Sequence, residues 1–222
     1  RVYPYVKGAF EYFCGYENER GLLENVTEKW NLVDWPENLR DGYDFPLTNP
    51  IGMGVHNVIN AFWIGFLKAF DELSEIMGLP VTGKAARTEK SYIEAFFNEK
   101  TGLFCDSPAK KHSAIHSNVL PLYFGVKKND RAFVKNAVEF IEEKRLTSMG
   151  VYMSYFALAA LKKNGEEEKA MALATDKNAW LNMIAEGGTA TFEAWGKEQK
   201  WNTSLFHPWA VAPLIVFSEV DL

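Results

Sequence analysis

The sequence predicts an all-α protein built as a helical toroid or as part of one. Two observations favour this fold. No stretch shows a convincing alternation of apolar and polar residues, so strands are not expected. Helical segments that are apolar nearly all round alternate with amphipathic ones, as two concentric layers of helices require. No fixed-length repeat is present, so the hairpins are related in architecture only.

The chain begins with an expected amphipathic helix from Val2 to Tyr16. Its apolar residues recur at helical spacing: Val2, Tyr5, Val6, Ala9, Phe10 and Phe13. From Glu24 to Pro50 the periodicity disappears, which predicts a loop of roughly 25 residues, and loops of this length in compact proteins are usually functional. We expect this loop to form one wall of a pocket.

The clearest helical signal runs from Val55 to Met77, where apolar residues recur every three or four positions and Gly78 ends the pattern. A second helix begins near Thr82 or Gly83 and ends before the turn NEKTG. The two helices predict an αα-hairpin.

The second half of the sequence predicts six further helices. The helices expected from Ser113 and from Val151 are apolar over most of their surface. The segment that follows each of them is amphipathic or charged. Prolines at positions 208 and 213 predict that the last helix starts late or bends. The expected ranges are Ser113 to Phe124, Asp130 to Lys144, Val151 to Leu161, Glu166 to Thr175, Asn178 to Ala185 and Ser204 to Val220.

Composition excludes several classes of partner. The net charge is -5 and no Lys/Arg-rich block is present, so neither nucleic acid nor an anionic membrane is expected to bind. The longest uncharged run, Phe45 to Leu67, contains two prolines and three glycines and is not expected to span a membrane. Cys14 and Cys105 form neither a disulfide framework nor a CxxC pair. The chain starts at Arg1 without a signal region, which predicts a processed or trimmed start and leaves cytoplasmic and exported locations both open.

The segment from Gly187 to Ala210 has the composition of a sugar-binding site. Its aromatic side chains can stack on the apolar face of a pyranose ring, while a hydroxyl or an imidazole can hydrogen-bond to the sugar hydroxyls. Glu193 supplies a carboxylate for proton transfer, and His207 follows closely. The aromatic residues are Phe192, Trp195, Trp201 and Trp209.

The sequence resembles glycoside hydrolase family 78, the α-L-rhamnosidases, along essentially its whole length. The resemblance is carried by VDW (Val33 to Trp35), TGLFCDSP, HSAIHSNVLPLYFG, GTATFEAW and SLFHPWA. It implies an incomplete (α/α)6 toroid with about four αα-hairpins present. Residues 1–222 would form a single domain, the C-terminal portion of the catalytic barrel, without the N-terminal hairpins and any accessory β-domains.

The resemblance also implies roles for individual residues. Glu193 would be the general base, and His207 would contact the sugar where the bond breaks. Asp34 and Trp35 lie in a loop that in the family reaches toward the same pocket, and Trp195 is a candidate sugar platform. The implied reaction removes terminal α-L-rhamnosyl residues with inversion and needs no cofactor. Its general acid would lie outside this chain, so the isolated chain is expected to be nearly inactive.

Each candidate residue also has a purely structural interpretation. Asp34 could be a turn residue, and both Trp35 and Trp195 could belong to the core. His207 could cap a helix, and Glu193 could be a solvated loop residue. One further pair, His112 and His116, is spaced to face one way on a helix, but no third ligand is visible, so no metal is expected.

Other functions remain open from the residues alone. A non-catalytic carbohydrate-binding α-toroid module would keep the aromatic residues without needing a base. Another six-hairpin glycosidase is a close competitor, although the absence of a clear Arg/Lys clamp disfavours a uronic acid substrate. A helical-repeat interaction protein would not explain the Trp-rich loops. The expected ligand is a rhamnose-containing oligosaccharide or glycoside, and the apolar faces of an incomplete toroid predict a homodimer.

Overall fold

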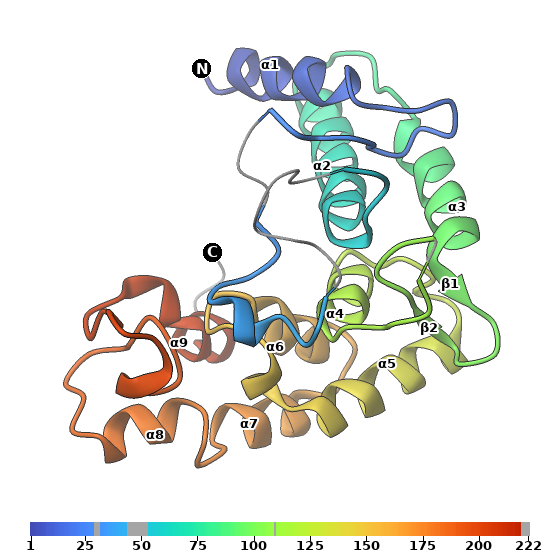
Figure 1. Cartoon of the computed structure of the whole chain (residues 1–222). Helices are drawn as coiled ribbons and strands as arrows, with labels where there is room; N and C mark the ends of the chain where they lie inside the picture. Colours follow the sequence, from blue (N-terminus) through green and yellow to red (C-terminus); the bar gives the residue numbers. More distant parts are fainter. Residues whose placement is uncertain (29–31, 44–52, 109, 219–222) are drawn as a thin grey trace. The chain divides into compact units, whose positions relative to one another are not determined.

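A computed structural model describes residues 1–28, 32–43, 53–108 and 110–218. The described chain is mostly helical, which confirms the all-α prediction (Figure 1). It divides into two compact units. Unit 1 comprises Arg1–Val33 and Asp44–Ser113, and unit 2 comprises Asp34–Tyr43 and Ala114–Leu222. No helix among the described residues has both the length and the apolar character needed to cross a lipid bilayer.

The described residues of unit 1 form three helices and a hairpin of two short strands. Helix α2 packs against both α1 and α3, so it forms the centre of this unit. Its residues repeat with the three-and-four spacing of an amphipathic helix, and that spacing gathers the buried side chains on a common face. The elements are α1 (Tyr3–Cys14), α2 (Asn57–Ile76), α3 (Lys84–Phe96), β1 (Phe97–Asn98) and β2 (Leu103–Phe104).

Aromatic side chains of α1 close over the buried face of α2. Trp63 and Leu67 are almost completely buried, and Phe10 stacks on Phe70 with ring centroids 4.4 Å apart. Each such side chain contributes about 1.5–3 kcal/mol when it is fully buried. An apolar hollow of about 200 Å³ lies beside this cluster, lined by Phe13, Leu23, Ile59, Phe62, Trp63 and Phe66.

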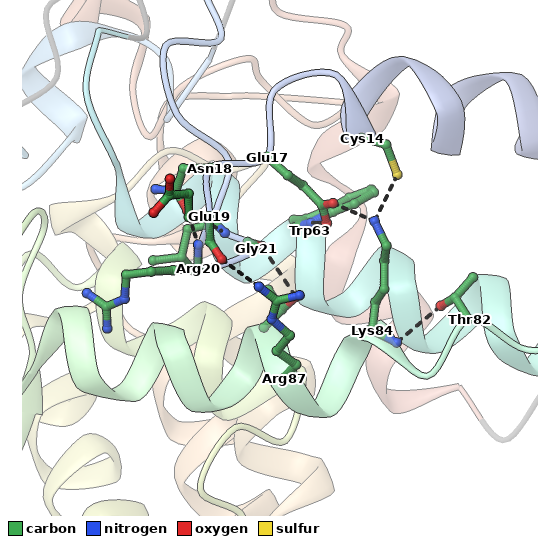
Figure 2. A network of polar contacts seen from close by, with 12 residues as sticks. Cys14, Glu17, Asn18, Glu19, Arg20, Gly21, Trp63, Thr82, Lys84 and Arg87 are labelled. Atoms are coloured by element: carbon green, nitrogen blue, oxygen red, sulfur yellow. Dashed lines mark hydrogen bonds and ion pairs between the residues drawn. The ribbon is translucent and has the colours of Figure 1, made fainter.

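A polar network fastens the chain that leaves α1 to the two neighbouring helices (Figure 2). The Lys84 ammonium donates to Glu17 Oε2 at 2.5 Å and lies 3.3 Å from Cys14 Sγ. The other carboxylate oxygen of Glu17 accepts a hydrogen bond from the indole N–H of Trp63 at 3.2 Å. One carboxylate therefore links α2 and α3.

Unit 2 is organised around α6, which packs against α4, α7 and α9. Both α4 and α6 are buried over most of their length, whereas α5 buries only one face. This is the pattern predicted for inner and outer helices. The α-helices of this unit are α4 (His116–Tyr123), α5 (Arg131–Lys144), α6 (Ser154–Lys163), α7 (Glu167–Ala174), α8 (Trp180–Ala185) and α9 (Ala212–Phe217). The 3-10 turns are Glu37–Leu39, Leu146–Ser148, Lys197–Gln199 and Pro208–Ala210.

Residues 34–43 are held on unit 2 by their acidic side chains, although they are distant from the rest of it in sequence. Asp41 accepts a hydrogen bond from the backbone N–H of Ile115 at 2.8 Å and forms an ion pair with Lys144 at 2.9 Å. Arg40 makes an isolated β-bridge with Met149. The buried contacts of Asp34, described below, complete the attachment.

Most of the expected helices differ from the observed ones by one to three residues at an end, and the last one differs by more. The helix predicted from Ser204 to Val220 is wrong at its start, because helix α9 begins only at Ala212 and residues 204–207 pair with residues 191–193 instead. Residues 219–222 lie outside the described chain. The helix predicted from Ser113 begins at His116. The β1–β2 hairpin was not predicted, because two-residue strands are too short to show alternation.

The start of α5 provides a test of local stability. The side chain of Asp130 caps this helix by accepting hydrogen bonds from the N–H groups of Ala132 and Phe133, at 3.0 and 3.1 Å. Its pKa lies below the ordinary aspartate value, chiefly because of the hydrogen bond from Lys127 and those from the helix N-terminus. Asp130→Ala is expected to lower the free energy of unfolding by about 1 kcal/mol in urea denaturation, and Asp130→Asn by less, because asparagine still caps. Equal losses in the two variants would contradict the capping role.

Candidate active site around Glu193

The segment that carries Glu193 is held by hydrogen bonds between two loop segments, residues 191–193 and residues 204–207. The backbone N–H of His207 donates to Thr191 O at 2.8 Å, and that of Glu193 donates to Ser204 O at 2.9 Å. The Thr191 hydroxyl donates to His207 O at 2.7 Å. Two neighbouring stretches of the chain are thereby paired, and Glu193 and His207 lie near each other.

The carboxylate of Glu193 is buried and is held by two donors. Its Oε2 atom accepts a hydrogen bond from the Lys200 ammonium at 2.5 Å and another from the Ser204 backbone N–H at 3.0 Å. Burial alone would raise the pKa of Glu193. The Lys200 and Ser204 hydrogen bonds, with the nearby charges of Lys200 and His207, outweigh burial, so the pKa lies below the ordinary glutamate value. Glu193 is therefore an anion at neutral pH.

The neighbours of Glu193 in sequence anchor it to the interior of unit 2. Phe192 is 1% exposed and its backbone N–H points at Met183 Sδ, 3.3 Å away. Trp195 is 3% exposed, and its indole N–H donates to Met149 O at 2.7 Å. The Trp195 ring also meets Trp180 edge to face, with centroids 4.9 Å apart. The backbone on either side of the carboxylate is thus fixed by buried aromatic side chains.

Asp34 is buried and makes three close polar contacts. Its Oδ2 atom lies 2.6 Å from His116 Nε2 and accepts the Gly150 N–H at 2.7 Å. Its Oδ1 atom accepts the Trp35 N–H at 2.8 Å. Because His116 and Gly150 hold this carboxylate, its hydrogen bond from the Trp35 N–H fixes the backbone of Trp35.

Trp35 is half-buried and lies beside the partner of Glu193. The Lys200 ammonium lies 5.7 Å from the centroid of its ring, within the range of a cation–π contact. The structure therefore brings Glu193 and Trp35 to the same ammonium group of Lys200, and His207 lies near Glu193. The remaining two candidates, Asp34 and Trp195, are buried supports of this group.

Three residues of this site were not singled out by the sequence: Lys200, Ser204 and Gly150. Lys200 stands in the polar stretch KEQKW, where nothing in the local pattern separates it from Lys197. The residue types around Glu193 suggest that threonine hydroxyls and nearby backbone amides keep it ionised. The Ser204 backbone N–H does donate to the carboxylate, but the Thr191 hydroxyl is bound to His207 O, and the Lys200 ammonium is the other donor. The general rule that a buried carboxylate needs a cation was the signal available.

The histidine pair considered for metal binding is separated by its contacts. Because α4 begins at His116, His112 lies before the helix and meets Asp106 Oδ2 at 2.6 Å, whereas His116 meets Asp34. Within the ranges that the structure describes, no group of three or more His, Cys, Asp or Glu side chains is arranged to hold a metal ion.

A family model described as the bacterial alpha-L-rhamnosidase 6 hairpin glycosidase domain matches residues 1–219. The chain belongs to this rhamnosidase family. The match confirms the resemblance recognised in the sequence motifs, and it assigns the mostly helical architecture to an incomplete six-hairpin toroid. No curated protein matches this rhamnosidase-family chain.

Solved structures of rhamnosidases share its fold. The rhamnosidase from Klebsiella oxytoca with rhamnose bound is 15% identical, with a TM-score of 0.73, over 96% of this chain and 40% of that one. The family 78 rhamnosidase of Bacillus sp. GL1 is 20% identical, with a TM-score of 0.71, and the match covers 96% of this chain and 23% of that one. The Streptomyces avermitilis α-L-rhamnosidase complexed with L-rhamnose is 16% identical, with a TM-score of 0.66, and the match covers 97% of this chain and 20% of that one. This rhamnosidase-family chain therefore spans less than half the length of each.

Proposed function

We propose that this chain supplies the general base and part of the sugar site of a glycoside hydrolase that removes terminal α-L-rhamnosyl residues with inversion. The observation that carries the proposal is Glu193, a buried carboxylate held as an anion beside His207 and Trp35, in a chain of the rhamnosidase family. Two of the structural neighbours contain rhamnose, which supports this sugar as the ligand.

The charge state of Glu193 suits one of the two roles in an inverting mechanism. Such enzymes use two carboxyl groups about 6.5–9.5 Å apart, one protonating the leaving oxygen and one removing a proton from water. The acid must carry its proton, which usually requires a raised pKa, whereas the base must be ionised. Because the pKa of Glu193 is lowered, we assign it as the base. The acid, in this proposal, comes from outside the chain.

The neighbouring residues supply contacts to the sugar. We assign His207 to hydrogen bonding with a sugar hydroxyl, since its ring lies close enough to Glu193 to affect that carboxylate. Trp35 offers an aromatic face at the same site, held in place by Asp34. Trp195 contributes by fixing the backbone next to Glu193, through its indole hydrogen bond to Met149.

A homodimer stays a prediction from the sequence. Unit 2 exposes several large apolar side chains that such a contact would use, and Trp201 is 95% exposed. Ile184, Phe206 and Leu214 are also more than half exposed.

Hydrolysis of an aryl α-L-rhamnoside by the complete protein that contains this chain tests the proposal. We expect release of the aryl alcohol, with β-rhamnose as the first sugar product in proton NMR, because inversion changes the anomeric configuration. The isolated chain is expected to release little or none. If the complete protein binds rhamnosides without cleaving them or related glycosides, it is a carbohydrate-binding module instead. Cleavage of a different glycoside only would place it with another six-hairpin glycosidase.

A further inference from the structure

We propose that Lys200 is a positioning residue for Glu193, which holds this side chain as an anion and selects the carboxylate oxygen that receives the proton. This role rests on the proposed function of Glu193 as a base. It adds a residue that none of the sequence motifs includes.

The two carboxylate oxygens of Glu193 have different surroundings. Oε2 accepts both the Lys200 ammonium and the Ser204 backbone N–H. Among the described residues, no group donates a hydrogen bond to Oε1. A carboxylate oxygen that already holds two donors is a poor acceptor for a further proton, so Oε1 is the oxygen that takes the proton from water.

Burial increases the electrostatic attraction between Lys200 and Glu193 relative to that of a surface ion pair. The exposed fractions of the two side chains are 10% for Lys200 and 11% for Glu193. A charge in such a position requires a partner, because removing it from water is costly. Within the part of the chain that the structure describes, the titratable groups that face Glu193 are Lys200 and His207, and of these two Lys200 bonds to it directly.

Lys200 is itself held in place from two sides. The ring of Trp35 lies 5.7 Å from its ammonium. Its carbonyl accepts hydrogen bonds from both the backbone N–H and the hydroxyl of Thr203, at 3.2 and 2.8 Å. Thr203 therefore fixes the backbone of Lys200, and the Trp35 ring limits where its ammonium can lie, which suits a residue that orients another.

Titration of the Glu193 side-chain carbon by NMR, in this chain labelled with carbon-13 glutamate, measures the effect directly. Glu193→Gln assigns the resonance. In the unsubstituted chain we expect a pKa below the ordinary glutamate value, and in Lys200→Met we expect it to rise, because burial then acts without the compensating cation. Lys200→Arg is expected to restore most of the lowering, since it keeps the charge and can donate to the same oxygen.

Lys197→Met provides the matched control. Lys197 lies three residues earlier in the same loop and is exposed, and its ammonium donates to the Glu186 carbonyl, not to Glu193. Lys197→Met removes the same charge from the same loop. Because Lys197 does not bond to Glu193, this substitution should leave the titration of Glu193 nearly unchanged. An equal shift in the two methionine variants would overturn the proposal. So would an ordinary pKa of Glu193 in the unsubstituted chain.

The catalytic consequence is measured in the complete enzyme. Lys200→Met should move the acid side of the kcat/KM profile to higher pH and lower kcat more than it raises KM, because the base loses its charge and its orientation while sugar contacts remain. A KM effect alone would show that Lys200 binds sugar and would reject the positioning role. If the complete enzyme proves inactive on glycosides, the NMR titration still decides the ion-pair effect, and the function of Glu193 as a base fails separately.

Discussion

Replacing Glu193 by glutamine in the complete enzyme should reduce kcat/KM for an aryl α-L-rhamnoside at least about a hundredfold, the low end of what a general base contributes. Glutamine has nearly the same shape but cannot remove a proton from water. The loss should appear mainly in kcat, because the sugar contacts proposed for His207 and Trp35 would remain. Steady-state kinetics across a range of pH measures both parameters.

Two controls separate catalysis from folding in this experiment. Glu198→Gln makes the same chemical change at an exposed position five residues later and should leave kcat/KM unchanged. Circular dichroism shows whether the Glu193→Gln chain is folded, which matters because Lys200 loses its partner. A folded Glu193→Gln enzyme with activity close to that of the unsubstituted protein would reject Glu193 as the base.

The same substitution should also change how stability depends on pH. Since the pKa of Glu193 is lower in the folded than in the unfolded chain, its ionised form stabilises the fold. That contribution is fully present above the unfolded pKa, and it is lost as the pH falls through the folded pKa. Glu193→Gln should therefore flatten the decline in stability on the acid side of the profile.

Gly150→Ala is expected to lower the free energy of unfolding by about 3 kcal/mol, the upper part of the range for overpacking a buried site. A Cβ atom at this position would lie 2.3 Å from Asp34 Oδ1 and 2.6 Å from Trp35 O. The second of these atoms is backbone, so the whole turn has to move. Its movement also weakens the Gly150 N–H contact to Asp34, and buried polar groups are costly to leave unpaired.

Gly8→Ala is the matched control for this stability measurement. Gly8 lies in α1, and nothing is within 4 Å of a Cβ atom built there. Alanine at this position should stabilise the chain by about 0.5–1 kcal/mol, because it favours the helix. Urea denaturation of both variants decides the question. A Gly150→Ala chain as stable as the unsubstituted one would show that the Asp34 turn is not tightly packed.

The helices were predictable because their signal is local. From Val55 to Met77 each turn repeats the same apolar spacing, and the observed helix α2 runs from Asn57 to Ile76. The final helix was predicted too long for a reason that is not local. Residues 204–207 use their backbone groups to pair with Thr191 and Glu193, and Pro208 has no N–H group with which to extend a helix backwards.

The site was predictable only where the family motifs name its residues. Glu193, His207 and Trp35 come from three motifs, and the structure brings them to one place. Lys200 lies in a stretch without periodicity, and its contact depends on how that loop closes, which no spacing rule specifies. The role of Gly150 could not be predicted for a similar reason, since its partner Asp34 is 116 residues away in sequence.

That long separation has a consequence for how the molecule reaches its folded state. Residues 34–43 belong to the same compact unit as residues 114–222, while the chain on either side of them belongs to the other unit. During synthesis Asp34 is made long before His116 and Gly150. Its contacts to them, which hold the turn that carries Trp35, cannot form until both residues have been made. Contacts between such distant positions raise the contact order and slow folding. We therefore expect the site to form after the helices of unit 1.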